Sequence, residues 1–314
     1  MRGSLCLLVF LGVCLGSVQG GTPGCGTKPI YNGTILLSVQ RPEGERSFYL
    51  HVPQGFTNNE TIPLILTFHG WLIDTCENIA TCKTGDCDLT AESDQLGFIL
   101  VRGCGYKRSW NAGNCCSPAN ELHLDDNAFA LAIISLLSAT LCIDTTKIFS
   151  AGFSNGAMLS EVFACNQWNT FAAVASVSGV VEISPGGATG EEKCNASYAS
   201  GPRDISVLNV HGTADPVVPW EGNPFLGYPS IPSNNWNWAQ RNKCRGEPVQ
   251  TFSKGRYSNQ VYQNCTGHSQ VELVKNEGGG HEWPQDSTFD TTTYILSFFQ
   301  RVSGWKPWAP IELD

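Results

Sequence analysis

The sequence of 314 residues lacks several features that mark common classes of protein. It has no run of basic residues and a formal net charge of −9, which argues against nucleic acid or an anionic membrane as a partner. Beyond the N-terminus, no apolar stretch approaches the ~20 residues that a membrane-spanning helix needs. There is also no internal repeat and no low-complexity linker. These absences leave one large globular domain as the expected organisation.

The longest apolar run lies at the N-terminus. Arg2 precedes the apolar stretch 5–15, and Val18-Gln19-Gly20 supplies the small residues of a cleavage site. This pattern predicts a secretory signal peptide over residues 1–20 and a mature domain over 21–314. A retained N-terminal anchor is the alternative.

Cysteine is abundant, with 14 residues, of which two fall in the predicted signal peptide. An even number in a secreted chain predicts disulfides. A zinc site is disfavoured, because Cys76, Cys82 and Cys87 are too widely spaced for a zinc knuckle, and we expect no metal. The adjacent Cys115 and Cys116 are expected to bond to two different partners.

The surface chemistry is that of a secreted protein that handles neutral ligands. Only 15% of the residues are charged, whereas nine are tryptophan, and this combination suits carbohydrate or aromatic ligands. Four Asn-x-Ser/Thr sequons predict a glycoprotein; they begin at Asn32, Asn59, Asn195 and Asn264.

Short apolar runs alternate with helical patterns along the chain. Two segments with alternating polarity, 34–39 and 47–52, predict an antiparallel opening pair. Further strands are expected at 63–68, 98–102, 148–151, 172–178, 205–210 and 271–274, and helices at 127–140, 157–165 and 291–302. This alternation predicts an α/β fold, with a doubly wound, mostly parallel sheet whose carboxyl edge carries the functional loops. Cysteine-rich insertions at 74–87 and 103–118, together with 220–237, are expected to cover that edge.

The segment Gly152-Phe153-Ser154-Asn155-Gly156 joins a predicted strand to a predicted helix, which is the pattern of a nucleophile elbow. We expect strained backbone angles at Ser154. A side chain at Gly152 or Gly156 would collide with the neighbouring strand or helix. Alone, this motif is weak evidence in a chain with 33 glycines.

Two later loops strengthen the interpretation, because they supply an acid and then a histidine in the chain order of α/β-hydrolases. Asp215 follows the apolar run 205–210, and His281 follows the run 271–274. We expect His281 to accept the proton of Ser154 and later return it to the leaving alcohol, while Asp215 orients the imidazole. The structural alternatives are a turn-capping aspartate and a loop histidine. His211 is interpreted as packing or loop support.

Two backbone N–H groups are expected to form the oxyanion hole, those of Asn155 and of Trp71 in the His69-Gly70-Trp71 loop. His69 is expected mainly to brace this loop, and it is also a candidate substrate-binding residue together with Trp110 and Trp283. Trp110 lies in a cysteine-rich loop, where it either stacks on a sugar or phenolic ring or fills a small core.

Taken together, several motifs resemble the secreted feruloyl esterase and polyhydroxybutyrate depolymerase-like family, which is grouped with the carbohydrate esterases. They are His69-Gly70, Ser109-Trp110-Asn111 with Cys115-Cys116, Asp125-Asp126, Gly-Phe-Ser-Asn-Gly-Ala-Met, His-Gly-Thr-Ala-Asp and Gly-Gly-His-x-Trp-Pro. The resemblance spans about 47–302 and implies an α/β-hydrolase fold, with cystine-rich loops over the active-site edge and no cofactor. By position, it implies a triad of Ser154, Asp215 and His281, with Trp71 and Asn155 as oxyanion donors.

The leading hypothesis is a secreted serine carboxylesterase that acts on feruloyl or acetyl esters of plant-type polysaccharides, or on small phenolic esters. A polyhydroxyalkanoate depolymerase with the same triad is the alternative. Two points favour the former: many such depolymerases carry cysteine where this chain has Trp71, and no binding module follows Trp308. An inactive carbohydrate-binding relative is the alternative of another class. The sequence does not indicate the oligomeric state.

Overall fold

The structure is a computed structural model that describes residues 21–73, 88–167, 169–199 and 204–312. The predicted signal peptide and the predicted insertion at 74–87 lie outside these ranges. Within the described ranges, no helix has the length and apolar character needed to span a membrane.

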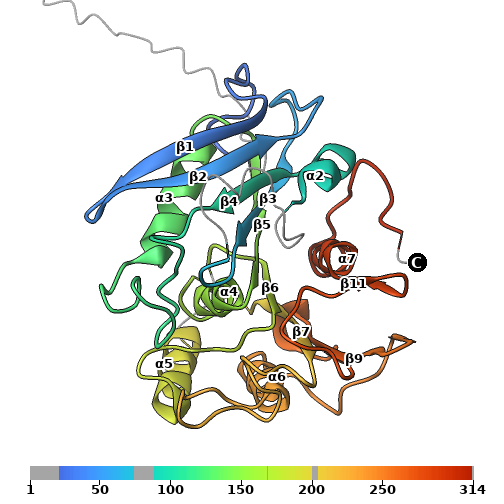
Figure 1. Cartoon of the computed structure of the whole chain (residues 1–314). Helices are drawn as coiled ribbons and strands as arrows, with labels where there is room; N and C mark the ends of the chain where they lie inside the picture. Colours follow the sequence, from blue (N-terminus) through green and yellow to red (C-terminus); the bar gives the residue numbers. More distant parts are fainter. Residues whose placement is uncertain (1–20, 74–87, 168, 200–203, 313–314) are drawn as a thin grey trace, which may run out of the picture.

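A ten-stranded sheet forms the centre of the molecule (Figure 1). Its strands, in spatial order, are β1 (Gly33–Arg41), β2 (Gly44–Val52), β4 (Ile99–Gly103), β3 (Ile62–Phe68), β5 (Ile143–Phe153), β6 (Ala173–Val177), β7 (Ser206–Gly212), β10 (Val271–Asn276), β9 (Tyr257–Tyr262) and β8 (Ser253–Lys254). The strands from β4 to β10 in this order run parallel. On either side of them, β2 and β9 run antiparallel to this central group, and the outermost strands β1 and β8 pair antiparallel with β2 and β9. The predicted doubly wound, mostly parallel sheet and its antiparallel opening pair are therefore confirmed.

Helices cover both faces of the sheet (Figure 1). One face carries α3 (Asp126–Ser138), α4 (Asn155–Asn166), α5 (Gly187–Ala199) and α6 (Ile231–Arg241), and the other carries α2 (Thr90–Leu96) and α7 (Thr291–Ser303). A 3-10 turn, η1 (Thr266–His268), precedes β10, and a hairpin of β11 (Gln285–Asp286) and β12 (Phe289–Asp290) precedes α7. Every residue of β3 is buried, as expected for a strand that is covered on both sides.

The helix α5 was not predicted, because the segment 179–203 reads as a loop rich in glycine, proline and serine. Only three of its described residues are buried, so its sequence lacks a broad apolar stripe. The disulfide between Cys165 in α4 and Cys194 in α5 holds the helix against its neighbour. A tertiary cross-link of this kind does not appear in local sequence periodicity.

Four disulfides join described residues: Cys25–Cys142, Cys115–Cys116, Cys165–Cys194 and Cys244–Cys265. The prediction for the adjacent pair is wrong, because Cys115 and Cys116 bond to each other, across a cis peptide bond.

Candidate active site

Ser154 occupies a sharp turn between two regular elements. The strand β5 ends at Phe153 and the helix α4 begins at Asn155, which leaves Ser154 alone between them with φ 53° and ψ −117°. A positive φ is uncommon for a residue other than glycine and costs free energy. The predicted strand, strained turn and helix are therefore confirmed.

The two glycines of the motif allow the helix to approach the sheet. A Cβ added at Gly152 would lie 2.7 Å from the backbone nitrogen of Ala157, and one added at Gly156 would lie 2.6 Å from the carbonyl oxygen of His69. Real Cβ atoms do not approach other atoms so closely. The predicted collisions with the neighbouring strand and helix are thus confirmed.

Asp215 and His281 meet at the carboxyl edge of the sheet, although 66 residues separate them in the chain. The carboxylate Oδ2 of Asp215 lies 2.8 Å from Nδ1 of His281, while its Oδ1 accepts the backbone N–H groups of Val217 and Val218 at 2.8 and 2.9 Å. Asp215 thus caps its own turn and also contacts His281. The turn-capping aspartate and the acid beside His281, given as alternatives from the sequence, are both present in the structure.

The charge of Asp215 is stabilised by its neighbours. Burial acts to raise the pKa of Asp215, but hydrogen bonds from His211, His281 and the N–H of Val218 outweigh it and hold the pKa well below its usual range. The aspartate is therefore an ionised acceptor at neutral pH, facing the Nδ1 side of the imidazole.

Two contacts of this region were missed by sequence reasoning. His211, interpreted from the sequence as packing or loop support, has Nε2 at 2.8 Å from the carbonyl oxygen of Val218 and at 3.4 Å from Oδ2 of Asp215. The hydroxyl of Ser178 donates to the carbonyl oxygen of Glu282 at 3.1 Å and so fixes the loop that carries His281. Nothing in the local sequence around His211 or Ser178 indicates these contacts.

His281 lies beside the elbow. Its ring centroid is 5.0 Å from that of Phe153, the residue before Ser154, and its side chain keeps 15% of its surface exposed. Asp215, in contrast, is only 4% exposed. His281 therefore contacts the buried Asp215 on one side and remains partly exposed to solvent beside the turn that carries Ser154.

The two predicted oxyanion donors flank Ser154. Asn155 is the first residue of α4, and an N–H at that position has no carbonyl partner within its helix. On the other side, a Cβ added at Gly70 would lie 3.3 Å from Cβ of Ser154, so the backbone that leads into Trp71 passes directly beside the serine.

His69 and Trp110 are both buried, which favours the structural interpretations of these residues over their prediction as substrate-binding residues. His69 is 3% exposed, and its ring lies 2.7 Å from the carbonyl oxygen of Gly70 and 3.0 Å from the N–H of Gly105, which matches the loop-bracing alternative. Trp110 is fully buried and packs edge-on against Phe68 at 5.1 Å. It is part of the main hydrophobic core, because the cysteine-rich loop folds inward at this point.

Trp283, the third predicted substrate-binding residue, is half-buried. Its indole N–H donates to the hydroxyl of Thr292 at 3.2 Å, at the start of α7. This contact ties the loop after His281 to the helix that follows it. A role in binding substrate stays a prediction.

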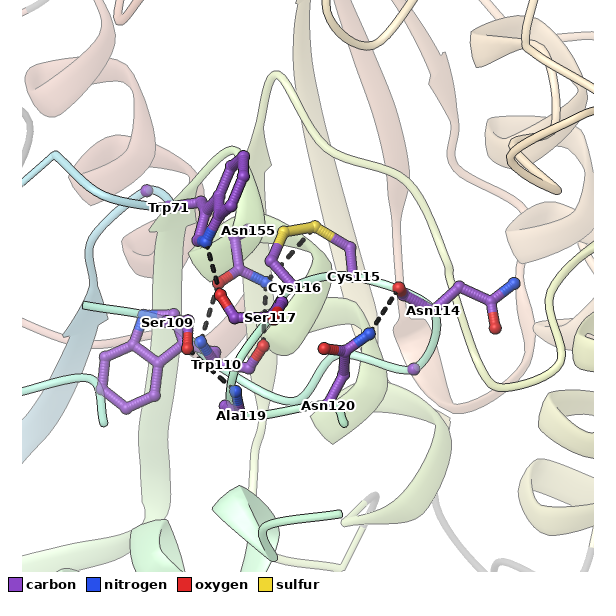
Figure 2. Close-up of a disulfide and its surroundings, with 12 residues drawn as sticks. Trp71, Ser109, Trp110, Asn114, Cys115, Cys116, Ser117, Ala119, Asn120 and Asn155 are labelled. Carbon is purple, nitrogen blue, oxygen red and sulfur yellow. Dashed lines mark hydrogen bonds between the residues drawn. A yellow bond between two sulfur atoms is a disulfide. The ribbon is translucent and has the colours of Figure 1, made fainter. Parts of the chain in front are cut away.

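The loop 103–118 is fastened to α4 by the side chain of Asn155 (Figure 2). Its amide oxygen accepts the N–H of Trp110 at 2.8 Å, and its amide nitrogen donates to the carbonyl oxygen of Trp110 at 3.1 Å and lies 3.8 Å from Sγ of Cys115. The sequence assigned only the backbone of Asn155, and a lone asparagine gave no signal for this second contact.

A buried ion pair holds the same loop at the next residue, Asn111. Arg46 is 3% exposed and donates to Oδ1 of Asp126 at 2.7 Å, while Oδ2 of Asp126 accepts the N–H of Asn111 at 2.7 Å. The neighbouring Asp125 caps α3 through the N–H of Ala128. Among the described residues, no cluster of three or more His, Cys, Asp or Glu side chains is placed to hold a metal ion.

Residues 126–223, which include the elbow, match the Phospholipase/Carboxylesterase family. Probable feruloyl esterase C of Aspergillus terreus is 30% identical over 253 residues, which are 79% of this chain and 83% of that protein. Feruloyl esterase B of Piromyces equi is 28% identical over 248 residues, which are 75% of this chain but only 42% of that protein.

Solved structures share the fold at low sequence identity. An acetyl xylan esterase from Aspergillus awamori superimposes with a TM-score of 0.60 at 18% identity, covering 84% of this chain and 98% of that chain. An S-formylglutathione hydrolase from Agrobacterium tumefaciens gives a TM-score of 0.56 at 13% identity, covering 88% of this chain and 100% of that chain. The chain therefore has the α/β-hydrolase fold.

Proposed function

This chain belongs to the feruloyl esterase family, a group of carboxylic ester hydrolases, and we propose that it is a secreted serine esterase that acts on hydroxycinnamoyl or acetyl esters of polysaccharides. The relatives named feruloyl esterase support the class of substrate. The observation that carries the proposal is the Asp215–His281 hydrogen bond beside a serine in a strained elbow.

In the proposed first half-reaction, the hydroxyl of Ser154 attacks the ester carbonyl carbon. His281 accepts the serine proton on Nε2, because its Nδ1 faces Asp215. The negative charge that develops on the carbonyl oxygen is stabilised by the N–H groups of Asn155 and Trp71. The C–O bond then breaks, and the alcohol leaves with the proton returned by His281.

The second half-reaction releases the acid from the acyl-enzyme. Water gives a proton to His281 and attacks the acyl carbonyl carbon, and the same two N–H groups stabilise the oxyanion. Expulsion of Ser154, reprotonated by His281, regenerates the enzyme.

The secretory route is part of the proposal. The predicted signal peptide over 1–20 would direct the chain to an oxidising compartment, in which the observed disulfides persist. The asparagines of all four sequons are exposed, which glycosylation requires; they are Asn32, Asn59, Asn195 and Asn264.

The first test is hydrolysis of methyl ferulate and of p-nitrophenyl acetate by the wild type and by Ser154→Ala. We expect the wild type to hydrolyse methyl ferulate and the variant to lose about 10³-fold or more in kcat for both esters, because removal of the nucleophile leaves only binding and oxyanion stabilisation. The exposed Ser287→Ala in the β11–β12 hairpin is the matched control and should retain wild-type rates.

Each other outcome changes the proposal. Activity on p-nitrophenyl acetate alone would keep the serine mechanism and assign acetyl esters as the substrates. Folded wild-type protein without activity on either ester would refute the esterase proposal and favour a carbohydrate-binding relative.

A further inference from the structure

Trp71 is a large aromatic side chain that lies open to solvent beside the proposed nucleophile. Its side chain is 45% exposed, whereas Trp110 and Trp238 are fully buried in the core. The preceding residue, Gly70, approaches Ser154 closely enough that an added Cβ would lie 3.3 Å from Cβ of the serine. Trp71 therefore directly follows the residue that approaches Ser154, and its indole does not contribute to the buried core.

The orientation of the indole is fixed, although the ring is exposed. Its Nε1–H donates to the carbonyl oxygen of Ser117 at 2.7 Å (Figure 2). The N–H of Leu72 donates to the carbonyl oxygen of Arg108 at 2.9 Å. Rotation of the ring would break the first of these bonds. A ring that is held in place before a ligand arrives loses little conformational entropy on binding.

The loop that holds the indole is itself anchored to the site. Ser117 directly follows the Cys115–Cys116 disulfide, and Asn155 pairs with both backbone groups of Trp110 in the same loop. Because Asn155 is also the residue after Ser154, the position of the indole relative to the nucleophile is set by a short chain of contacts.

Sheet order decides which part of an ester would meet Trp71. The strand β3, which leads into Trp71, lies on one side of β5, while β7 and β10, which lead into Asp215 and His281, lie on the other. His281 must lie next to the leaving alcohol in order to protonate it. The alcohol therefore lies towards β7 and β10, and the acyl group extends towards β3 and Trp71.

Resting on the proposed esterase function, we propose that Trp71 is the specificity-determining residue of the acyl subsite, where its indole forms an aromatic wall next to the Cys115–Cys116 disulfide. A hydroxycinnamoyl group presents a flat ring that stacks on such a wall, and offset or edge-on aromatic pairs are favourable beyond the area that they bury. An acetyl group has no ring to stack on the indole. Trp71 thus sets the preference for aromatic over acetyl esters.

The test compares p-nitrophenyl ferulate with p-nitrophenyl acetate, which share a leaving group and differ only in the acyl group. We expect Trp71→Ala to lower the ratio of kcat/KM for the ferulate to kcat/KM for the acetate at least tenfold, equivalent to ~1.4 kcal/mol. Trp71→Phe, which keeps a flat ring, should retain most of the ferulate activity. Trp236→Ala is the matched control, because Trp236 is a similarly exposed tryptophan (48%) on α6. The ferulate-to-acetate ratio of kcat/KM in this variant should equal that of the wild type.

A second measurement separates binding of the acyl group from a purely structural effect. Free ferulate lacks the alcohol part of the ester and should inhibit the wild type competitively. Its inhibition constant should rise in Trp71→Ala in parallel with KM for p-nitrophenyl ferulate. A ferulate-to-acetate ratio unchanged by the substitution, or equal losses on both esters, would overturn the inference. A loss that appears only when methyl ferulate is replaced by a feruloylated sugar would place Trp71 on the alcohol side and also overturn it.

The outcome for the wild type distinguishes the two proposals. If the wild type hydrolyses neither ester, the proposed function fails and this inference fails with it. If the wild type is active and only the ratio test fails, the proposed function stands and the role of Trp71 alone is refuted.

Discussion

At the scale of single residues, several side chains of this site serve two partners at once. Asp215 uses one carboxylate oxygen to hold its own turn and the other to contact His281. The backbone N–H of Asn155 is a proposed oxyanion donor, while its side chain binds the backbone of Trp110. Because each of these residues links a loop to the reacting group, substitution of either changes both the geometry of the loop and the chemistry.

Glu182 is a buried carboxyl group outside this set. It follows β6 and is fully buried, and burial raises its pKa from 4.5 to about 8, against a smaller opposing effect of the Asn114 amide. The folded protein therefore keeps Glu182 protonated at a pH where the unfolded chain has released that proton. The contribution of Glu182 to the free energy of unfolding is therefore fully present below about pH 4.5 and is lost as the pH rises towards 8.

Glu182→Gln should remove this decline, because glutamine stays neutral at every pH. At pH 5 we expect the variant and the wild type to unfold at similar temperatures. At pH 8 the variant should be more stable by about 2 kcal/mol or more, which raises Tm by roughly 5 °C or more. Thermal unfolding across this pH range measures the difference.

Glu192→Gln provides the control, because Glu192 is an exposed residue of α5. Its Tm should follow the wild-type pH dependence. Parallel curves for Glu182→Gln and the wild type from pH 5 to pH 8 would show that Glu182 titrates as it does in the unfolded chain.

At the scale of elements, the unit of β5, Ser154 and α4 depends on close approach between strand and helix. The carbonyl oxygens of Phe68 and His69, at the end of β3, lie against Gly156 at the start of α4. The same contact brings the loop after β3 next to Ser154. Helix position and the proposed oxyanion donors are thus coupled through one glycine.

Gly156→Ala should therefore disrupt both packing and the site. The added Cβ would lie 2.6 Å from the carbonyl oxygen of His69, and rigid backbone on both sides leaves no room for it. We expect the free energy of unfolding to fall by about 3 kcal/mol or more, measured by urea denaturation. Gly280→Ala, where a Cβ meets nothing within 4 Å, should unfold at nearly the wild-type urea concentration. Equal stability of the two variants would refute the argument.

The elements that could be predicted from the sequence are those whose evidence is local. The burial of β3 follows from its own apolar run, and the close approach at Gly152 and Gly156 follows from the absence of a side chain there. Both predictions are confirmed. The helix α5 is held by a disulfide to α4, and the inward turn of Trp110 depends on its packing against Phe68. These features arise from contacts between distant segments, so local pattern and propensity could not show them.

At the scale of the whole molecule, sheet topology assembles the site. The loops after β3, β5, β7 and β10 come from positions more than 200 residues apart, and parallel pairing brings their carboxyl ends to one edge. The chain order of serine, aspartate and histidine predicted this convergence. The pairing of Cys115 with Cys116 was not predictable in the same way, because adjacent cysteines carry no information on local backbone direction.

Covalent labelling of the folded enzyme tests the central claim, that this molecule is a serine esterase acting through Ser154, most directly. Diethyl p-nitrophenyl phosphate reacts with an activated serine, which displaces p-nitrophenolate and becomes a diethyl phosphate ester. Intact mass and peptide mapping should show one such group per chain, on Ser154, and methyl ferulate should slow its appearance. Labelling of another residue with Ser154 unmodified, or hydrolysis of methyl ferulate that persists after full labelling of Ser154, would contradict the account.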